Sequence, residues 1–249
     1  MRNLIIDIGN SRVKYGVFDD NQLIFNGKNE GHSFCNIAEI AAKYDTQHGI
    51  ICTTINLDDK QREELLGLNP DMVFMDYKTA IPIKNLYKSP QTLGMDRLAA
   101  AIGAYNDTKN DTLIIDLGTA ITYDFVTKAG EFVGGNISLG MEMRFKALKD
   151  YTSQLPLVSP DGPHPSLGED TDTAIRCGVL DGMTYEIEGY IRQFTIKHPN
   201  LCIFFTGGDE LYFEDEIKKR IFADKFIVMK GLNEVLMYNE SLKRSHKTK

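Results

Sequence analysis

The 249-residue sequence contains no tryptophan and only four cysteines, the widely separated Cys35, Cys52, Cys177 and Cys202. No CxxC pair occurs, so the cysteine spacing predicts neither a disulfide framework nor a zinc finger, and four reduced thiols are expected. His32 lies three residues before Cys35, but two ligands without a second pair are weak evidence for zinc.

Positive charge is also scarce. The chain has 28 Lys and Arg against 35 Asp and Glu, which gives a net charge of −7. This balance argues against a nucleic-acid partner, because proteins of that class usually carry a basic face. The last nine residues, 241–249, are basic, and such a segment is typical of a solvated terminal tail.

Long apolar runs are missing too. Stretches such as 98–105 fall far short of the roughly 20 residues that a membrane helix needs. Asp7 interrupts the apolar N-terminal region and no cleavage site follows, so no signal peptide is predicted. We therefore expect a cytoplasmic protein with no membrane partner. The GxGxxG and GxxxxGK[ST] patterns are also absent, which disfavours a dinucleotide-binding Rossmann site and a P-loop.

The most informative feature that is present is an internal repeat. Residues 4–10 read LIIDIGN and residues 113–119 read LIIDLGT, with five of seven positions identical at an offset of 109. Each copy continues as strand, polar turn and strand, over 13–24 and 122–133. A duplication of this size predicts two similar domains with a cleft between them and a boundary near 106–111.

The remaining pattern alternates between strands and helices, which indicates a layered α/β fold. Further strands are predicted at 49–55, 71–76 and 201–208, and helices at 58–68, 97–105, 141–150, 172–194 and 214–222. The segment 152–168 holds four of the eight prolines. It is predicted to be a long surface loop, and the sequence leaves open whether this loop acts as a lid.

The first repeat carries an Asp-Gly turn with several polar side chains, at residues 7–11. A glycine there lets the backbone approach a ligand and offers N–H groups to an anion. Ser11 and Lys14 add a hydroxyl and a cation, so the hairpin suits ATP phosphates with a metal held by Asp7. An ordinary hairpin turn, capped by its Asp and Asn side chains, is the alternative.

The second Asp-Gly turn, at 116–120, lies at the equivalent place in the second repeat and favours the ligand-binding interpretation. A third glycine turn at 205–209 follows a predicted strand. A fourth, at 134–140, precedes a predicted helix, whose N-terminus favours anions. Together the four turns predict a nucleotide-binding cleft.

The sequence Gly94-Met95-Asp96-Arg97 could also carry chemistry. Asp96 lies where the predicted helix 97–105 begins, which is a natural N-cap position. Alternatively, its carboxylate could accept the proton of an attacking hydroxyl, since phosphoryl transfer depends mainly on positioning and charge stabilisation. Arg97 could bind an anionic substrate group with two hydrogen bonds.

Five ordered motifs, DIGNSRVK, YKSPQTLGMDR, DLGTAITYD, GGNISLG and DTDTAIRCG, resemble those of type III pantothenate kinases. That family belongs to the superfamily of acetate and sugar kinases, heat-shock 70 chaperones and actin. The resemblance implies an α/β fold of two duplicated ribonuclease-H-like (actin-like ATPase) domains, at 1–111 and 112–240, with the basic tail 241–249. It also implies a homodimer and the ATP-dependent phosphorylation of pantothenate, the first step of coenzyme A biosynthesis.

The resemblance also implies site residues. The ATP-binding residues would be Asp7, Ile8, Gly9, Asn10, Ser11, Arg12, Val13, Lys14 and Thr119. Those for pantothenate would be Tyr87, Gly94, Met95, Asp96, Arg97 and Thr171, with Thr173 close enough to compete with Thr171. Asp96 would be the general base and Asp116 would bind a monovalent cation. The family uses Mg²⁺ with ATP and requires K⁺ or ammonium.

Three positions depart from the family pattern. Ser11 stands where Thr is usual and keeps the hydroxyl, Leu139 replaces a proline, and Leu117 replaces a cysteine. None of these changes affects the expected base.

Two other functions compete with this interpretation. One is a transcriptional accessory regulator of the same fold, which would not need the complete set Asp7, Lys14, Asp96, Arg97 and Asp116. The other is a different small-molecule kinase of the superfamily. Tyr87 together with the GMDR sequence argues against that kinase, because this pairing belongs to the pantothenate subgroup.

Overall fold

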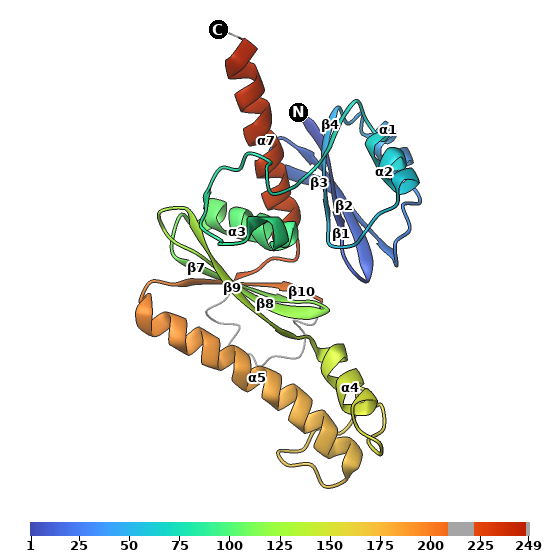
Figure 1. Cartoon of the computed structure of the whole chain (residues 1–249), viewed down its shortest axis with the longest axis vertical. Coiled ribbons are helices and arrows are strands. Elements are labelled where there is room, and N and C mark those ends of the chain that lie inside the picture. The colour runs from blue at the N-terminus through green and yellow to red at the C-terminus, as the bar shows by residue number, and fades with distance from the viewer. Residues whose placement is uncertain (209–221, 248–249) are drawn as a thin grey trace. The chain divides into compact units, whose positions relative to one another are not determined.

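The computed structural model describes residues 1–208 and 222–247, which form an α/β fold with two mixed sheets (Figure 1). The predicted helix 214–222 and Asp209 of the third glycine turn lie outside the described residues, except for Phe222. The chain divides into two compact units. The first comprises 1–109, 126–134 and 226–249, and the second comprises 110–125 and 135–225. The domain ranges expected from the sequence stay a prediction.

The first sheet has the strand order β3-β2-β1-β4-β5. Its strands are β1 (Arg2–Ile8), β2 (Arg12–Asp19), β3 (Gln22–Glu30), β4 (His48–Thr53) and β5 (Asp71–Phe74). β1, β2 and β3 form an antiparallel meander, and β4 and β5 continue the sheet in parallel to β1. β1 is buried from its second residue onward, as its run of Leu and Ile predicts for a central strand.

Four helices belong to this unit, namely α1 (Ile37–Lys43), α2 (Asp59–Leu66), α3 (Met95–Thr108) and α7 (Ile227–Lys247). α3 and α7 lie side by side (Figure 1). Their backbones approach closely at Gly103 and Gly231, where a side chain on Gly231 would collide with the carbonyl of Ala99. The sequence analysis predicted no helix at α7, and residues 241–247 of the expected tail continue it.

The second sheet has the order β11-β10-β7-β8-β9-β6. Its strands are β6 (Lys84–Asn85), β7 (Thr112–Leu117), β8 (Ala120–Val126), β9 (Glu131–Leu139), β10 (Cys202–Gly207) and β11 (Phe222–Ala223). β7, β8 and β9 adjoin one another in the same order as β1, β2 and β3, and β7 repeats the LIID sequence of β1. The predicted duplication is therefore confirmed at the level of the strands.

In the part of the chain that the structure describes, helices α4 (Met141–Asp150) and α5 (Thr171–Lys197) pack against this sheet, while a short 3-10 helix, η1 (Pro90–Thr92), precedes α3. The predicted apolar stripe of α5 is confirmed, since Ile175, Val179, Met183 and Ile187 are buried in one core with side chains of β7, β8 and β10. The segment 151–170 contains no helix or strand, as its prolines predict.

One local expectation was wrong. Helix α3 begins at Met95, with Gly94 as its N-cap, so Asp96 lies within the first helical turn and is not the cap. The physical reason is that Gly94 has an extended backbone and Met95 is already helical, so the N-cap position falls on Gly94. The carboxylate of Asp96 is therefore not needed to cap the helix.

Within residues 1–208 and 222–247, no helix combines the length and the apolar character that crossing a membrane requires.

Candidate active site

The hairpin between β1 and β2 presents the first Asp-Gly turn. Asp7 is only 7% exposed, near the end of β1, and lies opposite Lys14 in the antiparallel register. The Gly9 N–H donates to the Arg12 carbonyl at 3.0 Å and closes the turn. Ile8 and Val13 are buried and anchor it. In contrast, Asn10, Ser11 and Arg12 are exposed, where they could meet a ligand.

Asp96 lies on the first turn of α3, in the same unit. Its Oδ1 accepts a hydrogen bond from the backbone N–H of Arg97 at 2.8 Å. Burial raises the pKa of Asp96, and the positive charges of Arg97 and Lys14 offset only part of that effect. A side chain on Gly94 would crowd the Asp96 carboxylate, so the glycine gives it room. The structure therefore makes Asp96 a better proton acceptor than an exposed aspartate.

Cys52 is a residue of this site that the sequence analysis missed. It is fully buried on β4, directly opposite Asp7 in the parallel register. Burial, followed by the charges of Asp7 and Asp96, raises the pKa of Cys52 well above its ordinary value. Its thiol therefore stays protonated beside the two carboxylates. The sequence predicts reduced thiols that are buried or idle, and the burial of Cys52 agrees with this, but its position beside Asp7 follows only from the pairing of the predicted strand 49–55 with 4–10.

Tyr87 is held next to Arg97. The Arg97 guanidinium carbon lies 5.9 Å from the centre of the Tyr87 ring, and the ring also packs against Phe132. Gly134 has φ +129°, and a side chain there would meet the Tyr87 ring at 3.2 Å. The first unit thus brings together Asp7, Lys14, Tyr87, Asp96 and Arg97.

In the second unit, glycine turns converge on the second Asp-Gly turn. The N–H of Gly208 donates to the Leu117 carbonyl at 3.0 Å, and the N–H of Gly140 donates to the Thr119 carbonyl at 3.2 Å. Side chains on Gly140 or Gly207 would collide with this turn. The three turns therefore pack together around Asp116 and Thr119.

The donor chemistry of both Asp-Gly turns fits hard cations. Mg²⁺ prefers oxygen ligands such as carboxylates, and we extend this preference to K⁺. Asp7 and Asp116 supply such groups on buried strands. Thr119 adds an exposed hydroxyl three residues after Asp116.

Thr171 and Thr173 differ sharply in the structure. The Thr173 hydroxyl is buried in the capping box of α5, where it lies 2.9 Å from Asp170 Oδ1 and accepts from the backbone N–H of Glu169 at 2.9 Å. Thr171 is exposed on the first turn of α5. It lines a largely apolar groove of about 810 Å³ between α4 and α5.

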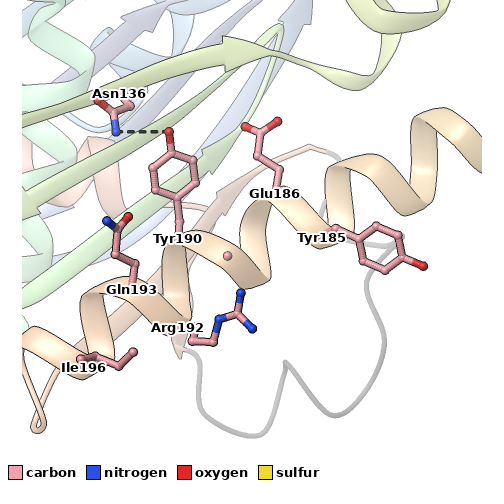
Figure 2. A pocket seen from close by; sticks show the side chains of 8 residues that line it. Asn136, Tyr185, Glu186, Tyr190, Arg192, Gln193 and Ile196 are labelled. Carbon is pink, nitrogen blue, oxygen red and sulfur yellow. Dashed lines mark hydrogen bonds between the residues drawn. The ribbon is translucent and has the colours of Figure 1, made fainter.

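A polar network on α5 was also missed by the sequence analysis. Glu186 forms an ion pair with Arg144 and accepts hydrogen bonds from Tyr123 at 2.9 Å and Ser138 at 3.2 Å. Burial disfavours the charge of Glu186, but these donors outweigh it and lower its pKa. Figure 2 shows Glu186 and Tyr190 on the adjoining pocket of about 580 Å³, with Asn136 donating to the Tyr190 hydroxyl.

The model of the family described as type III pantothenate kinase matches residues 3–193. A type III pantothenate kinase of Phocaeicola vulgatus is 46% identical over 241 residues, covering 96% of this chain and 100% of the relative. One of Christiangramia forsetii is 36% identical over 244 residues, covering 96% and 99%.

Solved structures agree on the fold. A conserved Baf family protein from Campylobacter jejuni has a TM-score of 0.61 at 20% identity, covering 96% of this chain and 99% of that one. The activator of 2-hydroxyisocaproyl-CoA dehydratase from Clostridium difficile, solved with bound ADPNP, has a TM-score of 0.53 at 11% identity, covering 100% and 98%. The predicted fold of duplicated ribonuclease-H-like domains is confirmed. The chain belongs to the type III pantothenate kinase family.

Proposed function

We propose that this protein transfers the γ-phosphoryl group of ATP to the primary hydroxyl of pantothenate, giving 4'-phosphopantothenate and ADP. Family membership supports the reaction. The observation that carries it is the environment of Asp96, whose pKa is raised by burial while Arg97 and Lys14 lie close enough to act on its charge. A carboxylate tuned in this way is suited to accept a proton during phosphoryl transfer.

Asp96 is the proposed general base. As the pantothenate hydroxyl oxygen attacks the γ-phosphorus, its proton passes to an Asp96 carboxylate oxygen. The bond between the γ-phosphorus and the bridging oxygen breaks, and ADP leaves with the bonding electron pair. The helix that carries Asp96 is buried along most of its length, which fixes the position of the carboxylate.

Pantothenate binding is assigned to Tyr87 and the turn 94–97, with Arg97 pairing the substrate carboxylate. The Tyr87 ring, held by Phe132 and Gly134, offers an apolar surface beside that cation. From the second unit we assign Thr171 rather than Thr173. The hydroxyl of Thr173 is buried in the capping box, whereas Thr171 is exposed on a groove.

ATP binding is assigned to residues 7–14 and to Thr119, on the two Asp-Gly turns. Lys14 and the backbone N–H groups of the first turn are suited to phosphate oxygens. Mg²⁺ bound with ATP, and K⁺ or ammonium held by Asp116, would offset phosphate charge. The glycines that converge on Leu117 and Thr119 support this assignment, because they allow neighbouring turns to pack directly against the second Asp-Gly turn.

A homodimer through the face of α4 and α5 is also proposed. Tyr151, which follows α4 and lines the groove with Thr171, is 90% exposed, and Ile196 near the C-terminal end of α5 is 77% exposed. The groove lined by Thr171 is mostly apolar as well. An exposed apolar groove is typical of a surface that contacts another protein molecule. All four cysteines are free thiols, which supports the cytoplasm as the proposed location.

The test is ADP release by the purified protein with Mg-ATP and pantothenate, measured in K⁺, ammonium and Na⁺. We expect turnover that depends on pantothenate, proceeds in K⁺ or ammonium, fails in Na⁺ and is largely lost in Asp96→Asn. Activity in Na⁺ equal to that in K⁺ would remove the monovalent cation from the proposal. Folded protein with no turnover in any cation would instead favour a regulatory function or a kinase with a different hydroxyl substrate. A screen of hydroxyl substrates would distinguish these two functions.

A further inference from the structure

Three side chains of types that bind transition metals meet where the proline-rich loop crosses α5. His164 comes from the loop, while Cys177 and Asp181 lie one helical turn apart on α5. The His164 Nε2 lies 2.8 Å from Asp181 Oδ1, and one ligand atom from each of the three residues lies within 4.8 Å of the others. We propose that His164, Cys177 and Asp181 form a zinc site that fastens the loop to α5.

The ligand set suits Zn²⁺ better than a hard cation. Zn²⁺ takes thiolate, imidazole and carboxylate ligands in tetrahedral sites, whereas Mg²⁺ and Ca²⁺ prefer oxygen alone. Bonds of roughly 2.0–2.3 Å place neighbouring ligand atoms about 3.5 Å apart in a tetrahedron. The 2.8 Å between His164 Nε2 and Asp181 Oδ1 lies below that value, and no pair of the three ligand atoms is more than 4.8 Å apart. The thiolate of Cys177 and the carboxylate of Asp181 would neutralise the ion, and water would fill the fourth position.

The loop is already held in place without metal. Arg176 donates from Nε to the Ser159 carbonyl at 3.0 Å and from Nη1 to the Pro163 carbonyl at 2.8 Å. Gly162 has φ +136° and lies against the guanidinium of Arg176. These contacts already order the backbone next to His164. Metal binding is therefore not weakened by the conformational entropy that ordering the loop would cost.

Cys177 already faces the same segment. Its thiol donates to the Pro165 carbonyl at 3.0 Å, one residue after His164. Asp181 lies four residues further along α5, and residues at this spacing share one helix face. On binding, the thiol proton passes to solvent, a sulfur–zinc bond replaces the S–H bond, and no electrons are transferred. One proton is therefore released per ion.

The test uses the full-length protein, stripped with a chelator and titrated with Zn²⁺ or Co²⁺ alone. We expect one ion per chain, and with Co²⁺ a near-ultraviolet charge-transfer band from sulfur. Cys177→Ser should abolish that band. Cys177→Ser, His164→Gln and Asp181→Asn should each weaken Zn²⁺ binding by at least roughly 100-fold, since even losing an outer-shell partner of a metal ligand lowers affinity 10–100-fold.

Cys35→Ser is the matched control, because Cys35 is an exposed thiol in the other unit. It should keep both the band and the affinity. Circular dichroism checks the fold of each variant. If Cys177→Ser misfolds, the zinc affinities of His164→Gln and Asp181→Asn still test the proposal. Stoichiometric Zn²⁺ binding that survives all three ligand changes, a Co²⁺ complex without the sulfur band, or no binding by the wild type would each overturn the proposal.

Discussion

Each unit of the molecule holds a partly buried carboxylate next to an arginine. The pKa of one carboxyl group is raised and that of the other is lowered. In the first unit burial raises the pKa of Asp96, and the hydrogen bond from the backbone of Arg97 offsets only part of that effect. In the second unit burial acts on Glu186 in the same sense. There, however, donors from Arg144, Tyr123 and Ser138 outweigh it and lower the pKa.

The arrangement of donors explains this difference. The Arg144 guanidinium pairs directly with Glu186, together with two hydroxyl groups. At Asp96 the donors are the backbone N–H groups of Arg97 and of Asp96 itself, and the Arg97 guanidinium lies over the Tyr87 ring. A carboxylate whose lone pairs are filled by side-chain donors stabilises the fold, whereas one with fewer donors remains available to take a proton.

The largest effect expected from this comparison is on turnover. Asp96→Asn keeps the acceptor for the Arg97 N–H but removes the proton-accepting oxygen, so kcat should fall by roughly 10²–10⁴-fold. Glu186→Gln is the matched control and should lower kcat by less than about tenfold, because its donors are structural. Steady-state kinetics with saturating pantothenate measures both. Equal losses of kcat in the two variants would show that the different surroundings of Asp96 and Glu186 do not distinguish a catalytic carboxylate from a structural one.

Much of this site could be predicted from the sequence, since its motifs are local. The Asp-Gly turns, the 94–97 turn and the stripe of α5 follow from short-range patterns of glycine, charge and apolar spacing. The contacts of Cys52 and Glu186 depend instead on pairing between distant segments. β4 places Cys52 opposite Asp7, and α5 brings Glu186 to Tyr123, 63 residues earlier in the chain. Helix α7 was missed because it buries its apolar face against α3, far away in the sequence.

The next effect is on stability. Glu186→Gln should lower the free energy of unfolding by about 2–3 kcal/mol at neutral pH, because it weakens hydrogen bonds to a charged group. Since the pKa of Glu186 is lowered on folding, its stabilisation is present above its unfolded pKa of about 4.3. It is lost as the pH falls through the folded pKa. Urea unfolding at neutral and acidic pH tests this. A difference from wild type that stays constant down to acid would contradict it.

Asp96→Asn should change stability in the opposite sense. A raised pKa means that folding disfavours the ionised carboxylate, so the amide should raise the free energy of unfolding by roughly 1 kcal/mol at neutral pH. The gain should vanish below the unfolded pKa of about 3.9, where both states of the wild type are protonated. Thermal melts from pH 3 to 8, compared with those of Glu186→Gln, check the sign and the loss of the gain in acid. A less stable Asp96→Asn protein at neutral pH would show that the carboxylate is well solvated.

The smallest effect isolates one donor of the Glu186 network. Tyr123→Phe removes the hydroxyl that donates to Glu186 Oε1 but keeps the ring, which stacks on Tyr190 with centroids 3.9 Å apart. We expect a loss of about 1 kcal/mol. Because Glu186 then has one donor fewer, its pKa should rise, and the acid limb of the stability curve should move to higher pH. An unchanged acid limb would mean that the Arg144 ion pair alone lowers the pKa of Glu186. The difference from Asp96 would then come from one guanidinium group and not from the full set of donors.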